Sequence, residues 1–419
     1  MRSRGNRGER RERRPLPPGF GTIWTTVAVD LIGFGVVLPL LPLYAERFHA
    51  SAATIGAMFA SFSVAQLIFA PIWGRVSDRI GRKPVLILSL VGTAIGTLLT
   101  GLAGSLALLF IGRIVDGASG ASVSVAHAAV ADVAPPKERA RLFGLLGAAF
   151  GVGFVAGPSI GAIAALAGPR TPFFVAAAIA GINALVAIRR LPETNRRRAG
   201  VGAPVSWTPQ TGLEDEVVSL DDDEEGAAEA RESSTPTAPA VERSIPRLLV
   251  IAFVSLVAFS AFEVTFPLFG HDRLGFELTS TAGLFAAIGL LLGAVQASLV
   301  HPAVRRFGET GTLRFGLATN AVGLLVLAAV HSWWLLVPAL VALVVGQGLA
   351  MPALTAAFAG SADTGRTGGV LGVQQSANGL ARVVGPLVGG FLFEHVGVAS
   401  PYVVGAAFMA FCAVLVTKS

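Results

Sequence analysis

Residues 74–84 read Gly-Arg-Val-Ser-Asp-Arg-Ile-Gly-Arg-Lys-Pro, and this short charged stretch lies between two long apolar runs, Thr54–Trp73 and Val85–Ala103. Each run has about 20 residues, the length that a helix needs to cross a hydrocarbon core of about 30 Å. The pattern predicts two transmembrane helices joined by a tight polar turn.

The same pattern recurs along the chain. Ten further apolar runs cover residues 22–43, 105–126, 142–167, 171–188, 248–269, 281–299, 313–330, 333–354, 368–393 and 401–416. Their apolar residues do not alternate with polar ones, which excludes the strands of a membrane barrel. The predicted fold class is therefore all-α integral membrane, with twelve transmembrane helices.

Composition and charge agree with a membrane protein. Of the 419 residues, 53% are hydrophobic and 14% are charged, whereas about a quarter of a soluble globular chain is charged. The net charge of +6 comes from arginine and lysine gathered in alternate loops, which places those loops and both termini in the cytoplasm. Since topology explains the basic residues, no nucleic-acid partner is expected.

A polar segment divides the apolar runs six and six. Residues 191–246 contain an acidic run, Asp221–Glu225, and cannot bury a core, so they are predicted to form a disordered cytoplasmic linker. Residues 1–18 are predicted to be a basic cytoplasmic tail. The remaining domains are an N-terminal six-helix bundle at 19–190 and a C-terminal bundle at 247–419.

The two bundles show an internal repeat. A shift of 228 residues places the Gly-Pro pair at 157–158 on that at 385–386, and a shift of 227 places Gly81 on Gly308. Chance overlap of glycines is the alternative, but separate regions agree on nearly one offset. The repeat predicts pseudo-symmetric halves with a site at their interface, as in transporters.

The loop after the second run has the features of a conformational latch. Gly81 suits a tight turn, and Asp78 could pair with a cation or a helix N-terminus. A plain basic loop would explain the arginines but not the spacing of Gly74, Asp78 and Gly81. The second half has Arg305 opposite Asp78, so the same latch is not expected there. The candidate latch residues are Gly74, Asp78, Arg79, Gly81, Arg82 and Lys83.

This loop resembles the cytoplasmic loop signature of the major facilitator superfamily. Residues 147–161 read Gly-Ala-Ala-Phe-Gly-Val-Gly-Phe-Val-Ala-Gly-Pro-Ser-Ile-Gly and resemble the span-five motif of the proton-driven antiporters of that family. Small residues let helices approach closely, and proline removes one helix hydrogen bond. Ordinary glycine packing is the alternative. The motif positions are Gly147, Gly151, Gly153, Gly157, Pro158 and Gly161.

The resemblance covers nearly the whole chain outside the tail and the linker. Leu-Ile-Phe-Ala-Pro at 67–71 and Gly-Arg-Ile-Val at 112–115 are similar to the tetracycline/proton antiporter branch of twelve-helix drug exporters. Where that branch has an acid in span three, Gly92–Thr97 has none. The resemblance implies the major facilitator fold and export of small compounds by alternating access.

Ionisable residues inside the predicted spans are expensive to insert and therefore mark candidate functional positions. Arg113 and Asp116 are three residues apart on one helix face and could pair, leaving Asp30 to titrate or to compete for Arg113. An exchange of ion partners between two conformations would load and release a proton. These three residues form the predicted proton-coupling site; a static structural ion pair is the alternative.

Glu263 is the candidate for substrate contact in the second half. With Phe259, Phe262 and Phe266 near it in sequence, it suits a cationic or amphipathic compound, although a hydrogen bond between helices is equally compatible. Arg382 could counter an acid or attract an anion. The further polar candidates, which could instead bridge helices, are Gln66, Asn320, Gln374, Gln375 and Asn378.

The sequence thus predicts a proton-coupled exporter of small amphipathic compounds, of multidrug or tetracycline-like type, in the inner (plasma) membrane. A symporter or a specific metabolite exporter of the same fold is one alternative, and a non-transporting receptor or scaffold is another. No enzyme is expected, because nucleotide loops and nucleophile–base patterns are missing. The expected partners are a small-molecule substrate, protons and the lipid bilayer, for a monomer that uses no metal and no cofactor besides the coupling proton.

Overall fold

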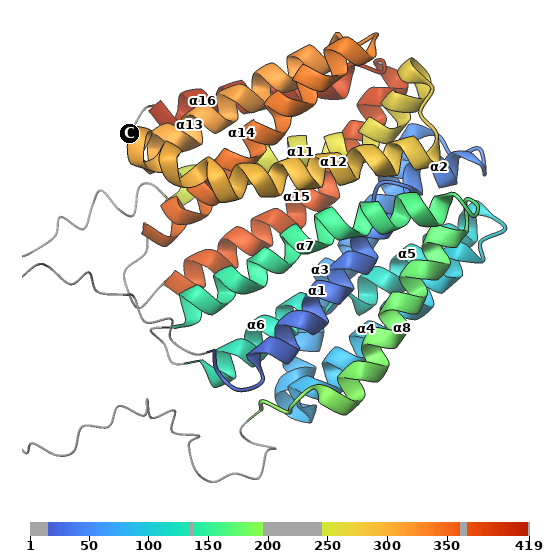
Figure 1. The fold of residues 1–419 in the computed structure, drawn as a ribbon, viewed down its shortest axis with the longest axis vertical. Coiled ribbons are helices and arrows are strands. Elements are labelled where there is room, and N and C mark those ends of the chain that lie inside the picture. The colour runs from blue at the N-terminus through green and yellow to red at the C-terminus, as the bar shows by residue number, and fades with distance from the viewer. Residues whose placement is uncertain (1–15, 135–137, 196–244, 361–366, 418–419) are drawn as a thin grey trace, which may run out of the picture. The chain divides into compact units, whose positions relative to one another are not determined.

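The computed structural model describes residues 16–134, 138–195, 245–360 and 367–417, and regular structure within these ranges is helical, without strands. This confirms the all-α fold class (Figure 1). The helices are α1 Phe20–Val37, α2 Leu41–Glu46, α3 Ala52–Ile80, α4 Arg82–Gly101, α5 Leu106–Ser119, α6 Ser122–Val133, α7 Arg139–Ala165, α8 Thr171–Arg190, α11 Ile245–Leu274, α12 Leu278–Ser298, α13 Val300–Ala328, α14 Trp333–Gly360, α15 Thr367–His395 and α16 Ser400–Thr417.

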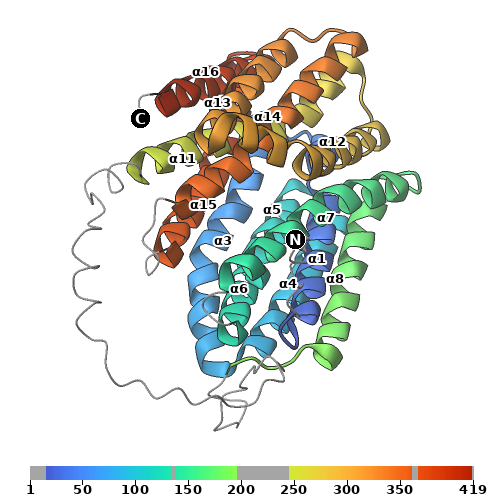
Figure 2. The same cartoon turned by 60° about the vertical axis from the view of Figure 1, so that its left-hand side comes forward.

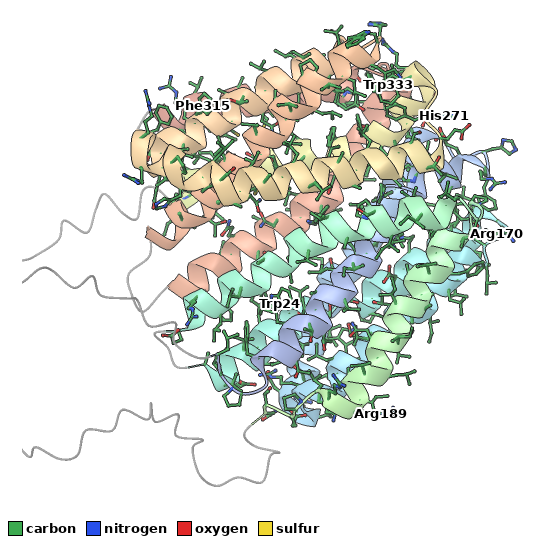
Figure 3. All side chains as sticks on the ribbon, viewed as in Figure 1. Trp24, Arg170, Arg189, His271, Phe315 and Trp333 are labelled. Carbon is green, nitrogen blue, oxygen red and sulfur yellow. The ribbon has the colours of Figure 1, made fainter. Side chains whose placement is uncertain are left out.

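Most of these helices can cross a bilayer. Ten helical segments in the described part of the chain are long and apolar enough to do so, with α5 and α6 together forming one of them. The shorter apolar helix α16 and the more polar α15 occupy the last two predicted spans. Apolar side chains project outward along the helices, and Trp334 is 91% exposed (Figure 3). Such a surface is stable only in contact with lipid.

Two of the predicted continuous spans are interrupted. The run at 22–43 divides into α1 and α2, because Pro39 and Pro42 lack the N–H groups that would continue the helix. The run at 105–126 divides at Gly120 into α5 and α6. A candidate membrane span remains in each place, Phe20–Val37 and Leu106–Val133, but neither run is one continuous helix, and the second interruption bears on the candidate site.

The helices group into two compact units. The first comprises residues 16–38, 65–134 and 138–195, and the second comprises 39–64, 245–360 and 367–417. The boundary falls within α3, so its first residues, from Ala52 to Val64, pack with the second unit. Of the predicted linker, Leu191–Asn195 is described and packed, whereas its acidic run lies outside the described residues.

In the first unit, α1 packs against α7 and α8, and α4 packs against α5 and α8 (Figures 1 and 2). Trp24 of α1 donates a hydrogen bond to the carbonyl of Leu145 on α7, 2.7 Å away. Asn183 of α8 donates to the carbonyl of Thr26 on α1 at 2.8 Å. Arg170 and Arg189 lie at opposite ends of α8 (Figure 3), which fits a helix that spans the bilayer.

In the second unit, α11 packs against α15 and α16, and α13 packs against α14. A Cβ added to Gly385 of α15 would lie 2.7 Å from the carbonyl oxygen of Val257 on α11, so these helices approach at a glycine. The α13 helix contains a turn at Gly308, whose φ of 70° is left-handed. Gly81 of the first unit has a φ of 108°, so both predicted turn glycines adopt a backbone that disfavours side chains.

Candidate functional site

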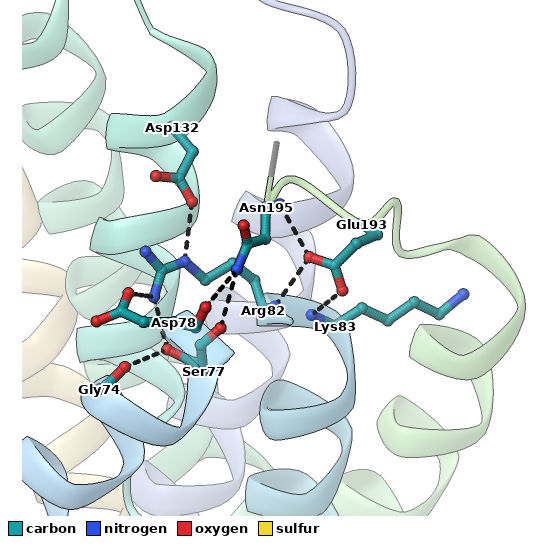
Figure 4. Close-up of polar contacts among 8 residues, drawn as sticks. All are labelled: Gly74, Ser77, Asp78, Arg82, Lys83, Asp132, Glu193 and Asn195. Carbon is teal, nitrogen blue, oxygen red and sulfur yellow. Dashed lines mark hydrogen bonds and ion pairs between the residues drawn. The ribbon is translucent and has the colours of Figure 1, made fainter. Parts of the chain in front are cut away.

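The turn between α3 and α4 is organised around the guanidinium of Arg82. It forms an ion pair with Asp78 at 2.7 Å and another with Asp132 of α6 at 2.8 Å, and it donates to the hydroxyl of Ser77 at 2.6 Å (Figure 4). Ser77 in turn donates to the carbonyl of Gly74. Arg82 is 8% exposed, so this cluster ties the turn to the end of α6 that carries Asp132 rather than forming a loose basic loop.

The chain that follows α8 completes this cluster. The carboxylate of Glu193 accepts hydrogen bonds from the backbone N–H groups of Arg82 (2.9 Å), Lys83 (3.2 Å) and Asn195 (2.9 Å). These include the first N–H groups of α4, which lack partners within their own helix. The Asn195 side chain donates to the carbonyl of Asp78 at 2.9 Å, near the end of α3 (Figure 4). Glu193 and Asn195 therefore cap two successive helices.

The structure explains why residue 81 is glycine. Its φ of 108° disfavours any side chain, and a Cβ at this position would collide with Oε2 of Glu193. Of the other predicted latch residues, Arg79 is exposed and Lys83 contributes its backbone N–H. Asp78, Gly81 and Arg82 thus lie together, with Gly74 one helical turn away.

The predicted span-five motif lies on α7 and divides into two groups. A Cβ on Gly153 would lie 2.7 Å from the carbonyl oxygen of Leu31, and one on Gly157 would lie 2.6 Å from Cα of Gly35, so both glycines permit close packing against α1. Pro158 and Gly161 are buried within the continuous helix. By contrast, a Cβ at Gly147 or at Gly151 would meet no atom within 4 Å.

The three predicted coupling residues come together in the first unit. Arg113 and Asp116 form a buried ion pair at 2.7 Å on α5, and the side chain of Thr93 also hydrogen-bonds Asp116. For Asp30 of α1, Oδ2 accepts from the hydroxyl of Ser122, the first residue of α6. Its Oδ1 is shielded from solvent and has no hydrogen-bond donor among the described residues.

Asp30 and Asp116 are close enough for their charges to interact. Asp116 is therefore held by an arginine, whereas Asp30 has one neutral donor, Ser122, among the residues that the structure describes. A site of this kind can take up a proton at the second carboxylate and adjust the first through their repulsion.

Glu263 is the corresponding buried acid of the second unit, on α11. It is 4% exposed, and its Oε1 accepts no hydrogen bond from the described residues. Arg382 of α15 interacts with it electrostatically. Phe262 and Phe266 stack with ring centroids 4.9 Å apart, and Phe266 is fully buried against Phe276 and Phe285. Phe266 therefore belongs to the packed interior, and Phe259 is the more accessible ring beside Glu263.

The other polar candidates are placed as follows. Gln66 donates to the carbonyl of Gly120 at 3.1 Å, and Asn320 donates to Oε1 of Gln347 at 3.2 Å, so both bridge neighbouring helices. On α15, Gln374 is buried, Gln375 is exposed and Asn378 is intermediate. The bridging alternative left open by the sequence is thus supported for Gln66 and Asn320.

Comparison with known proteins identifies the family. The sequence matches the model of the Major Facilitator Superfamily over residues 23–310 and 291–418. The chain belongs to the major facilitator superfamily. The resemblance to this superfamily that the loop at 74–84 indicated is confirmed.

Within the superfamily, the chain is similar to drug-resistance proteins. It is 33% identical to the class G tetracycline resistance protein of Vibrio anguillarum over 365 residues, 86% of each chain. It is 30% identical to multidrug resistance protein 2 of Bacillus subtilis (strain 168) over 381 residues, 90% of this chain and 88% of that protein. The human organic anion transporter MFSD10 (TETRAN) has a similar structure, with a TM-score of 0.67 at 26% identity, covering 96% of this chain and all of that one. These relatives support a multi-pass drug transporter of the superfamily.

The sequence patterns did not indicate several residues of the candidate site. They are Ser122 beside Asp30, Thr93 beside Asp116, and Ser77, Asp132, Glu193 and Asn195 around Arg82. The one available signal was the stretch Leu191–Asn195, in which a proline, an acid and an amide directly follow the basic end of α8. Ser77, Thr93 and Ser122 gave no such signal in the sequence, because serine and threonine are common in helices of membrane proteins.

Proposed function

We propose that this protein exports small amphipathic compounds in exchange for protons by alternating access. The observation that best supports this proposal is the buried cluster of Asp30, Arg113 and Asp116. In this cluster, one oxygen of Asp30 has no hydrogen-bond donor among the described residues. Burying the Arg113–Asp116 ion pair costs desolvation free energy. Asp30 lies close to this pair and its charged form has little stabilisation from hydrogen bonds, so protonation of Asp30 requires little free energy.

The role of each residue follows from its partners. Asp30 takes up the proton, and Ser122 holds the charged form through its hydroxyl. Arg113 neutralises Asp116 while Asp30 is charged, and it becomes available to Asp30 when the helices rearrange. The protein has no need of a nucleotide or a metal for this cycle, since the proton gradient supplies the driving force.

The substrate class rests on Glu263. A buried carboxylate whose Oε1 has no hydrogen-bond donor among the described residues, on the same helix as the paired rings of Phe259 and Phe262, suits a compound that carries a positive charge on an apolar body. The names of the tetracycline and multidrug resistance relatives agree with such a compound. Arg382 favours the alternative, an anionic substrate group, but it is already within electrostatic range of Glu263.

We place the protein in the inner membrane as a monomer with both termini in the cytoplasm. The basic residues at the end of α8 and in the α3–α4 turn, including Arg189 and Arg82, support this orientation. The turn cluster around Arg82 would then lie on the cytoplasmic side, where it would act as the latch of the exchange cycle.

The test uses inverted vesicles with an acidified lumen. Tetracycline or a cationic dye added outside should release luminal protons through the parent protein, and Asp30→Asn should abolish this release. The exposed Asp272 of α11 provides a matched control, because Asp272→Asn removes an acid far along the chain from the cluster. Equal proton release by Asp30→Asn and the parent would overturn the role of Asp30, and no release by the parent with any compound would overturn exchange itself.

A further inference from the structure

The fourth span is interrupted beside the coupling site. The α5 helix ends at Ser119 and α6 begins at Ser122, with Gly120 between them at φ −69° and ψ 50°. In a continuous helix, the carbonyls of Ala118, Ser119 and Gly120 would accept bonds from the N–H groups four residues later. The interruption removes those acceptor–donor pairs in the middle of an apolar segment, where an unpaired carbonyl is expensive.

Each of the three freed carbonyls receives a side-chain donor from another helix. The indole N–H of Trp73 on α3 donates to Ala118 at 2.7 Å. The carbonyl of Ser119 accepts from the hydroxyl of Ser89 on α4 and from the N–H of Ala121 at 2.7 Å, and the amide of Gln66 on α3 donates to the carbonyl of Gly120 at 3.1 Å. Three consecutive carbonyls thus each accept a hydrogen bond from a side chain of α3 or α4, so the interruption is supported by the packing of these two helices.

The interruption also decides what Asp30 contacts. Because α6 starts anew at Ser122, the first residues of α6 present their hydroxyl and N–H groups without partners inside the helix. Ser122 directs its hydroxyl to Asp30, and a carboxylate is stabilised at such a helix start. If α5 and α6 joined into one helix, the residues after Gly120 would rotate and rise, and Ser122 would leave Asp30.

We propose that Gln66, Trp73 and Ser89 are positioning residues of the coupling site, which hold α5 and α6 apart so that the start of α6 faces Asp30. This inference rests on the proposed proton exchange. It assigns Gln66 to the backbone of Gly120 and not to the substrate. Without the amide of Gln66, the carbonyl of Gly120 would form its most favourable hydrogen bond with the N–H of Ser124. This bond would join α5 and α6 into one continuous helix.

Two variants remove the same bond from opposite sides. Gln66→Leu keeps the size of the side chain and removes its donor. Gly120→Ala is compatible with the backbone at φ −69°, but its Cβ would lie 2.7 Å from Nε2 of Gln66 and displace the amide. Gly181→Ala on α8 is the matched glycine control, because a Cβ there meets no atom within 4 Å. For Trp73→Phe, the matched control is Trp24→Phe, which removes a donor to a carbonyl within a continuous helix.

The first measurement is hydrogen exchange of the purified protein over residues 117–126, which needs no transport. Closing the interruption pairs the first N–H groups of α6, so exchange there should slow about tenfold in Gln66→Leu, Gly120→Ala and their double variant alike. Unchanged or faster exchange in the variants would overturn the proposal, because a merely loosened structure exchanges faster. This arm stands even if the parent proves not to exchange protons, which would overturn only the proposed function.

The second measurement separates binding from coupling. Both variants should bind tetracycline or the cationic dye with the parental Kd, while their drug-induced proton release falls about tenfold. Weaker binding by Gln66→Leu together with parental behaviour of Gly120→Ala would make Gln66 a substrate contact and overturn the positioning role. Slowed hydrogen exchange with parental proton release would overturn the connection to Asp30.

Discussion

Replacing Glu193 with alanine should destabilise the end of the first unit that contains the α3–α4 turn. The carboxylate accepts three backbone N–H bonds, two of them from the start of α4 and one from Asn195. At about 1.5 kcal/mol for each bond to a charged acceptor, the sum is about 4 to 5 kcal/mol. Glu193 is only partly buried, so water replaces much of this, and the measured loss of a helix cap is about 0.5 to 2 kcal/mol.

We therefore expect Glu193→Ala to destabilise the protein by about 1.5 kcal/mol, and Glu193→Gln, which keeps acceptor oxygen but loses the charge, by about half of that. For a unit of this size, about 1.5 kcal/mol corresponds to a fall in apparent Tm of about 3 to 6 °C. The assay is thermal unfolding in detergent at one heating rate. The exposed Glu309 supplies the control, since Glu309→Ala should leave the apparent Tm unchanged.

Gly81 allows a sharper version of the same test. Gly81→Ala suffers both from the left-handed φ of 108° and from the collision with Glu193. The destabilisation that comes from the left-handed backbone, about 1 to 2 kcal/mol, is the same in the parent and in the Glu193→Ala protein. The collision with the carboxylate is absent once residue 193 is alanine. Gly81→Ala should consequently cost less in the Glu193→Ala protein than in the parent. Equal costs in both backgrounds, or an unchanged apparent Tm in Glu193→Ala, would refute the capping role of Glu193.

Two further predictions concern helix contacts. Gly157→Ala places a methyl group 2.6 Å from Cα of Gly35 and should cost about 1 to 3 kcal/mol by forcing α1 from α7, seen as a lower apparent Tm; a cost equal to that of Gly181→Ala would contradict this. Hydrogen bonds from the Ser51 side chain and from the N–H of Ala53 lower the pKa of the exposed Glu394 below its ordinary 4.5, so its stabilisation is present above that pH and is lost as acid protonates it. The apparent Tm difference between the parent and Glu394→Gln should therefore shrink when the pH falls from 7 to about 3.5 and in high salt, and a difference that is constant with pH would contradict the prediction.

The helical class and the positions of the spans could be predicted because they depend on local properties. A run of about 20 apolar residues has few alternatives in a bilayer, and the turn at Gly81 is marked by its glycine and its charges. The interruption at Gly120 depends on other helices. Its neighbours Ala118 and Ser119 are compatible with a continuous helix. The interruption is stabilised by hydrogen bonds from the side chains of Gln66 and Ser89, which the packing of other helices brings to these carbonyls.

The candidate site divides in the same way. The pairing of Arg113 with Asp116 follows from their spacing on one helix, which the sequence displays. The contact of Asp30 with Ser122 joins α1 to α6 across 92 positions, and no periodicity reports it. Glu193 was assigned to a disordered linker because its neighbours are polar, although a carboxylate that caps α4 needs no apolar neighbours.

The internal repeat supports our placement of the proposed proton coupling in the first half. With the shift of 227 residues, Asp116 corresponds to Leu343 and Thr93 corresponds to Asn320. The helix pairs α4–α5 and α13–α14 pack alike at glycines, but the second pair is bridged by the neutral amides of Asn320 and Gln347. Amides hold helices together without gaining or losing a proton near neutral pH. The first half therefore has a titratable side chain, Asp116, at a position where the second half has Leu343, and this difference supports the proposed coupling site around Asp30.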